Sequence, residues 1–220
     1  MSADLSGLGG AMKTELSLAA ASTAFLVIDM QNDFLASDAY CARRGLPVKS
    51  LRRTIRPILQ LREALPPETR TVYTLQVYAA DGSDDLSRVH AIRPSGLSRP
   101  KNEGPVRFGR GGAELIPELG MPAETVVKRR YDAFYQTDLE MRLRCWGIKT
   151  LIIGGVVSDI CVETTARAAY IRDFDIVLAT ECVAGWKATD TKRTIAIINR
   201  QFGVSLNNDQ IIRAFGAGSR

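Results

Sequence analysis

Three residues with reactive side chains each stand at the end of an apolar segment, although they lie far apart in the chain. Asp29 closes the first such segment, Lys128 closes a later one, and Cys161 follows a third after a short turn. A thiolate attacks carbonyl carbons, a carboxylate accepts protons, and an ammonium group stabilises nearby negative charge. If the segments are neighbouring parallel strands, their carboxyl ends meet at one edge of the sheet. The pattern therefore predicts a site for nucleophilic catalysis.

Cys161 is the candidate nucleophile of this site. If Ser158 caps a helix, Cys161 lies in its first turn, where free backbone N–H groups and the helix dipole favour an anion. Such a position lowers the pKa of a thiol. Taken alone, Cys161 also fits a small buried hydrophobic residue, which is the usual role of a free cysteine. Cys145 and Cys182 keep that second interpretation, and no role is predicted for Cys41.

Asp29 and Lys128 each allow two interpretations as well. A carboxylate at the end of an apolar strand can serve as a proton acceptor, but Asp29 could instead cap backbone groups of its own loop. Lys128 could stabilise a thiolate, or it could be a solvated residue beside Arg129 and Arg130. The single histidine, His90, cannot be placed near these residues, so a Cys–His dyad is not predicted.

Short apolar runs alternate with helical patterns along the chain, which favours a parallel sheet between helical layers. The predicted strands are residues 24–29, 71–77, 125–128, 150–154 and 175–179, with a weaker sixth at 203–206. The predicted helices are residues 49–65, 137–147, 158–172 and 190–201. The sequence thus predicts an α/β fold, a three-layer α/β/α sandwich with a mainly parallel sheet of about six strands. Residues 23–220 form its single domain, and residues 1–22 a flexible N-terminal extension.

The composition excludes several classes of protein. The 220 residues carry a net charge of +5 without a basic block, so nucleic-acid binding is not expected. Four cysteines without a CxxC pair, and one histidine, argue against a zinc site and against a disulfide scaffold. Neither a membrane span nor a signal peptide is apparent. We expect a cytoplasmic protein with reduced thiols, no metal and no cofactor.

The segment 80–112 is long for a simple connection and is rich in glycine, proline and charge. Such loops are often lids or binding loops, although a solvated surface loop fits the pattern equally well. Arg107 and Arg110 in this segment could clamp a substrate carboxylate, or both could face solvent.

Together these residues resemble the isochorismatase-like cysteine hydrolases. Residues 27–35, VIDMQNDFL, match the family's opening strand and aspartate motif. Lys128 with residues 131–139 matches its lysine segment, and residues 155–168 match its nucleophile segment. The resemblance runs from about residue 23 to residue 206. Three motifs in the same order are far more specific than one short motif.

The resemblance implies a mechanism, a fold related to the Rossmann type, and an assembly. Asp29 takes the proton of Cys161, the thiolate forms a thioester with the substrate, and water resolves it, with Lys128 orienting the pair. A cis peptide bond would join Val156 and Val157, and the N–H groups of Val157 and Cys161 would form an oxyanion hole. A small-molecule substrate and a homodimer or homotetramer are implied.

The resemblance also bears on the substrate. The segment 131–139 resembles the matching segment of the ureidoacrylate, biuret and N-carbamoylsarcosine amidohydrolases. These members of the family hydrolyse ureido, carbamoyl or simple amide groups, so the resemblance implies a substrate of that kind. Residues 77–85 lack the two histidines with which the nicotinamidase branch holds a metal. True isochorismatases lack the cysteine, so Cys161 argues against vinyl ether cleavage. We expect Phe34, Tyr131 and Phe134 to contact the substrate, and Tyr135 and Trp186 are further candidates for the pocket wall.

Two rival functions remain open at this point. The chain could be a non-catalytic binding or interaction protein that kept the fold, although the intact Asp29, Lys128 and Cys161 argue against it. A nucleotide-binding oxidoreductase could share a similar scaffold, but no G-x-G-x-x-G motif follows the first strand.

Overall fold

The computed structural model describes residues 16–85 and 103–216, and its centre is a sheet whose neighbouring strands all pair in parallel. In their order across the sheet, the strands are β3 (Thr125–Lys128), β2 (Arg70–Gln76), β1 (Thr23–Ile28), β4 (Thr150–Val156), β5 (Asp175–Ala184) and β6 (Val204–Leu206). This confirms the predicted α/β fold. The sheet is wholly parallel rather than mainly so, and β5 runs five residues beyond its predicted end.

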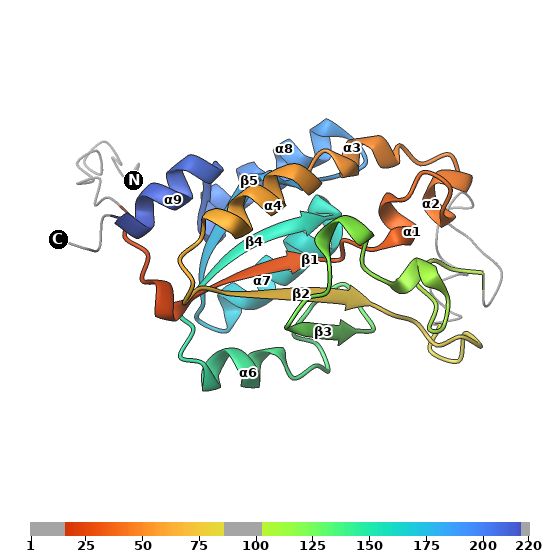
Figure 1. Ribbon diagram of the computed structural model, residues 1–220, viewed down its shortest axis with the longest axis horizontal. Coiled ribbons are helices and arrows are strands. Elements are labelled where there is room, and N and C mark those ends of the chain that lie inside the picture. The colour runs from red at the N-terminus through yellow and green to blue at the C-terminus, as the bar shows by residue number, and fades with distance from the viewer. Residues whose placement is uncertain (1–15, 86–102, 217–220) are drawn as a thin grey trace, which may run out of the picture.

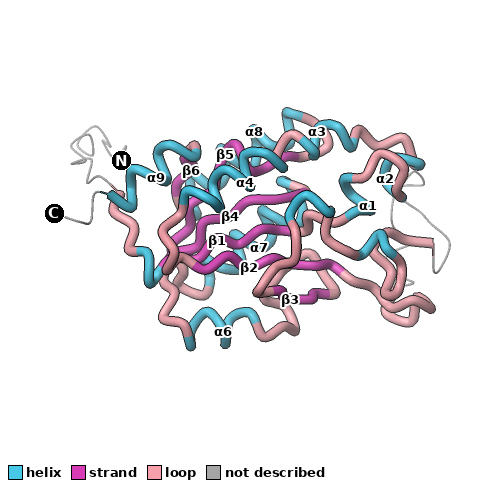
Figure 2. Tube along the Cα trace, in the orientation of Figure 1, coloured by secondary structure: helices cyan, strands magenta, loops and turns pink. Residues whose placement is uncertain are grey.

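Helices cover both faces of the sheet, as Figure 1 shows, and this explains why the strands are apolar without polar alternation. One face packs against α3 (Val48–Arg52), α4 (Ile55–Ala64) and α9 (Asn208–Gly216). The other face packs against α6 (Leu139–Cys145), α7 (Glu163–Ile171) and α8 (Ala188–Ile197). Figure 2 shows the magenta strands enclosed between the cyan helices. All six residues of β1 are buried, so the first strand lies at the centre of this core.

The helix predicted over residues 49–65 is two helices, α3 and α4, separated at residues 53–54. Pro57 explains the break, because a proline lacks the N–H of a helix interior and its ring clashes with the carbonyl four residues earlier. The side chain of Thr54 is buried at the junction and donates to the carbonyl of Leu51 at 2.8 Å. Two short helices, α1 (Asn32–Leu35) and α2 (Tyr40–Arg43), follow β1.

The packed part of the chain begins before residue 23, earlier than predicted. Leu18 is buried, and its backbone N–H donates to the carbonyl of Ala214 at 2.9 Å. Residues 1–15 of the predicted extension lie outside the described residues, as do residues 86–102 of the segment that could be a lid or a solvated surface loop, including His90. Among the described helices, none is both long and apolar enough to cross a membrane.

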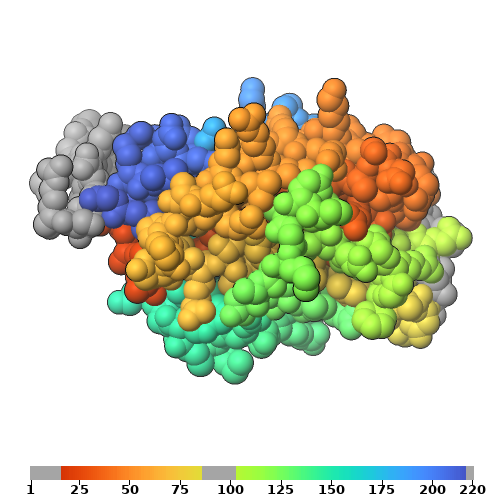
Figure 3. Space-filling view, viewed as in Figure 1, coloured from red at the N-terminus to blue at the C-terminus, as the bar shows by residue number. Residues whose placement is uncertain are grey.

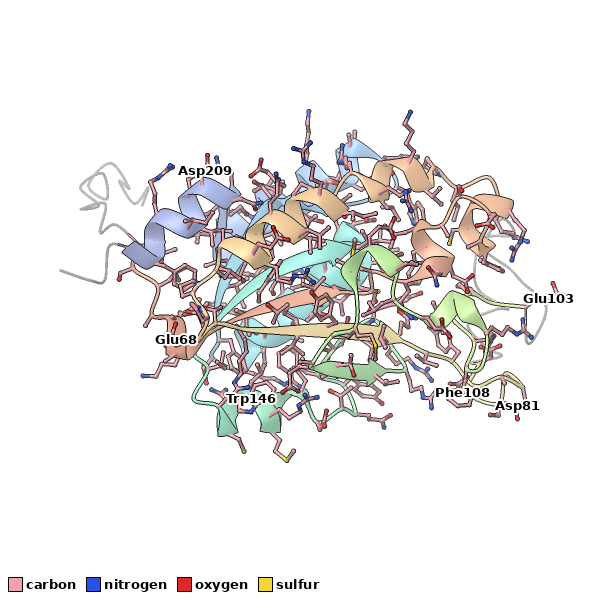
Figure 4. All side chains as sticks on the ribbon, viewed as in Figure 1. Glu68, Asp81, Glu103, Phe108, Trp146 and Asp209 are labelled. Atoms are coloured by element: carbon pink, nitrogen blue, oxygen red, sulfur yellow. The ribbon has the colours of Figure 1, made fainter. Side chains whose placement is uncertain are left out.

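The described ends of the 80–112 segment lie beyond the carboxyl ends of the strands. Figure 4 shows Asp81 and Phe108 at that end of the molecule and Glu68 and Trp146 at the other. Residues 103–119, green in Figure 3, pack beside the segment that follows β1. Asn32 N–H donates to the carbonyl of Glu114 at 2.9 Å, which ties the two segments together. The described parts of this segment, residues 80–85 and 103–112, therefore stand at the edge of the sheet where the reactive residues were predicted.

Candidate active site

Four neighbouring strands deliver the site. Asp29 follows β1 directly, and Lys128 is the last residue of β3. Between these two strands lies β2, which ends at Gln76, while Cys161 follows β4. Asp29 has a positive φ of 49°, a conformation that short polar residues tolerate better than most. Asp29 and Lys128 are about a hundred positions apart in the sequence, and Lys128 and Cys161 are more than thirty positions apart. The structure brings the three residues together because the carboxyl ends of neighbouring parallel strands meet at one edge of the sheet.

Asp29 and Lys128 form a fully buried ion pair. The Lys128 Nζ lies 2.7 Å from Asp29 Oδ2, and neither side chain is exposed. The other carboxylate oxygen, Oδ1, accepts a hydrogen bond of 2.6 Å from the hydroxyl of Thr74 on β2. Apart from the ion pair, Asp29 Oδ2 accepts no hydrogen bond of normal geometry among the described residues. The carboxylate is nevertheless close enough to the Cys161 thiol for its charge and a hydrogen bond to raise the pKa of that thiol.

The charge of Lys128 is retained despite its burial. Burial by itself would lower the pKa of Lys128, but attraction to Asp29 and Cys161 outweighs burial, and the net shift of the pKa is upward. Nζ also donates to Gln76 Oε1 at 3.2 Å and to the carbonyl of Arg130 at 3.1 Å. A buried ammonium with three acceptors is the arrangement that makes such burial tolerable.

Cys161 lies in a helical turn, but its thiol does not have the lowered pKa that the sequence predicts. Burial is the largest effect and raises the pKa of the Cys161 thiol far above its ordinary range. The Lys128 ammonium opposes this, and the Asp29 carboxylate adds to it. The Cys161 thiol is therefore neutral at rest, and a thiol in this state needs a base to remove its proton before its sulfur can act as a nucleophile.

The turn that carries Cys161 differs from the predicted capped helix. Residues Ser158–Val162 form one π-helical turn that leads into α7, and Val157 precedes it. The Ser158 hydroxyl donates to Thr191 Oγ1 at 3.3 Å, so it does not cap the helix. The Val156–Val157 peptide bond is cis, as the resemblance implies. Just before it, a Cβ on Gly155 would lie 2.1 Å from the carbonyl oxygen of Ile28, so only glycine lets β4 approach β1 this closely.

Gln76 is a member of the site that the sequence analysis missed. Its Oε1 accepts from Lys128 Nζ at 3.2 Å and from the Cys161 thiol at 3.4 Å. Gln31 holds its backbone on both sides, since Gln76 N–H donates to Gln31 Oε1 and Gln31 Nε2 donates to the Gln76 carbonyl, each at 2.9 Å. The signal was present, because Gln76 is a polar residue at the end of an apolar strand, as Asp29 is.

A cavity of about 120 Å³ has Cys161 in its wall. The residues that line it are Phe34, Gln76, Tyr78, Pro105, Tyr131, Val156, Val157, Ile160, Cys161 and Trp186. This volume is well below the 300 Å³ at which pockets for drug-sized ligands begin. The described wall is mostly apolar and aromatic, and such a site suits a small molecule.

Phe34 and Tyr131, two predicted substrate contacts, line this cavity, and so does Trp186. Phe134 does not. It is buried in the core on the α6 and α7 side, where its ring stacks on Phe174 at 5.9 Å. Tyr135 is exposed and is not among the described lining residues. The periodicity of a short aromatic segment cannot tell a core-facing ring from a cavity-facing one, and tertiary packing decides this.

Arg107 and Arg110, the two arginines that could clamp a substrate, are not among the described residues that line the cavity. The Arg107 side chain is fully buried, and its NH2 group lies 2.6 Å from Asp85 Oδ2. Its NH1 group donates to the carbonyl of Ala79 at 3.1 Å. Arg110 is exposed. Arg107 is thus held by acidic and carbonyl groups of the 79–85 segment, which replaces the predicted role of a clamp on substrate with one in holding the loop.

Comparisons with known proteins identify the family of this chain. The chain matches the isochorismatase domain over residues 23–210. The ureidoacrylate amidohydrolase RutB from Variovorax paradoxus (strain S110) is 29% identical over 213 residues, which cover 91% of this chain and 84% of that protein.

Solved structures share the fold of this chain. A cysteine hydrolase from Pseudomonas syringae pv. phaseolicola 1448A shares the fold with a TM-score of 0.79 at 24% identity, covering 91% of this chain and 95% of that one. N-carbamoylsarcosine amidase from Thermoplasma acidophilum superposes with a TM-score of 0.66 at 26% identity, covering 86% and 97%. Because the domain match spans most of the chain and the fold accords with it, the protein belongs to the isochorismatase family of hydrolases.

Proposed function

We propose that this protein is a cysteine-dependent amidohydrolase that cleaves the C–N bond of a small amide, ureido or carbamoyl substrate through a thioester intermediate. The observation that carries this proposal is the meeting of Cys161 with the buried Asp29–Lys128 pair at the base of a small cavity. Two relatives, a ureidoacrylate amidohydrolase and an N-carbamoylsarcosine amidase, support the substrate class.

The first half of the reaction forms the thioester. As the Cys161 sulfur attacks the carbonyl carbon, its proton passes to Asp29, and the carbonyl becomes a tetrahedral oxyanion. The Lys128 ammonium stabilises the sulfur while it carries negative charge. Asp29 then gives the proton to the leaving nitrogen, the C–N bond breaks, and the amine or ammonia departs.

The second half restores the enzyme. Asp29 takes a proton from water, the resulting hydroxide attacks the thioester carbon, and the C–S bond breaks. The sulfur recovers its proton from Asp29, and the substrate leaves as a carboxylic or carbamic acid. The backbone N–H groups of Val157 and Cys161 stabilise the oxyanion in both halves, and Phe34 and Tyr131 contact the body of the substrate.

The test is ammonia release from a panel of small amides, ureides and N-carbamoyl acids. For any substrate that is turned over, Cys161→Ser and Asp29→Asn should each lower the rate by at least about a thousandfold. Cys145→Ser is the matched control, because Cys145 is an exposed thiol on α6 and should leave turnover unchanged. Mass spectrometry of the rapidly quenched enzyme should show the acyl group on Cys161.

Two outcomes would refute the proposal. Full activity of Cys161→Ser would remove the thioester mechanism. Specific binding of a small amide without hydrolysis, together with a Cys161 that carries no acyl group, would favour a non-catalytic binding protein. We further expect a homodimer or homotetramer in the cytoplasm, which light scattering and cell fractionation would test.

A further inference from the structure

Gln76 stands at the centre of the site rather than at its edge. The side chain is 3% exposed, and a single atom, Oε1, accepts from both Lys128 Nζ and the Cys161 sulfur. The nucleophile and the ammonium therefore share one acceptor. Gln76 also lines the cavity, so its side chain borders the space in which we place the substrate.

The orientation of the amide follows from its partners. An ammonium has donors only, so the atom that faces Lys128 must be the oxygen. The amide nitrogen of Gln76 points the other way and donates to the Tyr78 hydroxyl at 2.6 Å. Gln31 fixes the backbone beneath, with hydrogen bonds to both the N–H and the carbonyl of Gln76. The amide is thus held at both ends and cannot rotate without losing bonds.

We propose that Gln76 is a positioning residue that holds the resting Cys161 as a neutral thiol until Asp29 accepts its proton. The catalytic part of this inference, the transfer of the Cys161 proton to Asp29, rests on the proposed function. The thiol S–H donates to Gln76 Oε1 at rest. When the proton moves to Asp29, the S–H bond breaks, an O–H bond forms on the carboxyl group, and the sulfur loses its hydrogen bond to Gln76. The Lys128 ammonium stays bound to Gln76 and so remains beside the thiolate.

The direction of the effect follows from the atom involved. A carbonyl oxygen carries partial negative charge, so it stabilises a thiol that donates to it and repels a thiolate. Removing that oxygen should therefore favour the thiolate. Among the described residues, the other titratable groups near the sulfur, on its own turn or at the start of α7 are Asp29, Lys128, Tyr78, Tyr131, Asp159 and Glu163. None of these groups changes in the variants of Gln76 below.

The experiment measures alkylation of Cys161 by iodoacetamide at about pH 8, with the Cys161→Ser protein subtracting the other thiols. Gln76→Met keeps the size of the side chain and removes the acceptor. The alkylation rate should rise about two- to fivefold, because a lost hydrogen bond shifts the thiol titration by about half to one unit and a less basic thiolate is a weaker nucleophile. Gln76→Glu keeps the shape and adds negative charge, so the rate should fall by at least as much.

The opposite signs exclude a simple change of access, since a looser cavity would speed alkylation in both variants. An unchanged or slower rate in Gln76→Met would overturn the proposal, and so would a shift of both variants in the same direction. If neither variant folds, Tyr78→Phe takes their place. It frees the Gln76 amide from its 2.6 Å hydrogen bond and should raise the rate up to about threefold, whereas an unchanged rate would count against the proposal.

Alkylation requires no substrate, so the two proposals fail separately. Full activity of Cys161→Ser would refute the thioester mechanism. The alkylation rates of the Gln76 variants would still test whether Gln76 holds Cys161 as a neutral thiol. Conversely, a functional thioester mechanism with an unaltered alkylation rate in Gln76→Met would remove only the role of Gln76.

Discussion

Replacing Lys128 with methionine should destabilise the protein strongly, because it leaves a charge buried without a partner. Lys128 and Asp29 lie 2.7 Å apart with no exposed surface on either side chain. The carbonyl groups of Gln76 and Arg130 also lose a donor. Breaking a buried ion pair by removing one partner costs about 3–5 kcal/mol. For a chain of this size, that cost corresponds to a fall in Tm of about 6–20 °C.

The assay is urea unfolding followed by tryptophan fluorescence and circular dichroism, with a double-mutant cycle. Lys128→Met combined with Asp29→Asn removes both charges, so the double variant should recover about half or more of the lost free energy. In the single variant, the uncompensated Asp29 binds a proton more readily when folded than when unfolded. Its stability deficit should therefore be smaller at about pH 4 than at about pH 8.

Two results would refute this reasoning. One is a single variant whose free energy of unfolding lies within about 1 kcal/mol of the wild type, a value typical of exposed ion pairs. The other is a double variant that is less stable than the single variant, since that would assign the loss to packing rather than to charge.

Gly155→Ala should prevent folding, because the new Cβ would lie 2.1 Å from the backbone of Ile28. The control is Gly147→Ala, where the φ is 69° and the space is open, and this variant should lose only about 1–2 kcal/mol of unfolding free energy. Soluble yield and thermal melts compare the two variants, and a folded Gly155→Ala protein of normal stability would contradict the close approach of β4 to β1. Burial raises the pKa of the Cys182 thiol to about 12, although a hydrogen bond to Asn208 opposes this. The stability that the buried Cys182 thiol contributes is fully present below about pH 8.5 and is lost as pH rises toward 12. Between about pH 8 and pH 10.5, the free energy of unfolding of the wild type should therefore fall by about 2 kcal/mol more than that of Cys182→Ala. Equal losses in the two proteins would show that Cys182 does not titrate differently on folding.

Much of the fold was predictable because strands and helices leave local patterns. Runs that are apolar on both faces predicted the strands, and the ends of β1 and β3 fall within one residue of those predictions. The break at Pro57 was readable in principle, since proline acts on its own helix. The extension of β5 to Ala184 was not, because that part of the strand contains polar residues, Thr180 and Glu181, among its buried ones. Only pairing with Gly155 and Val156 on β4 accounts for its length.

The sequence by itself determined which residue types stand at the strand ends, and parallel strands bring such ends to one edge whatever lies between them. Asp29, Lys128 and Cys161 could therefore be named as a group before any coordinates. Tertiary structure alone decided that the pKa of the Cys161 thiol is raised, because burial outweighs the attraction of Lys128. It likewise decided that Gln76 lies among them, that Arg107 pairs with Asp85, and that Phe134 faces the core. Each of these depends on which distant group is the nearest neighbour, and a linear pattern does not contain that distance.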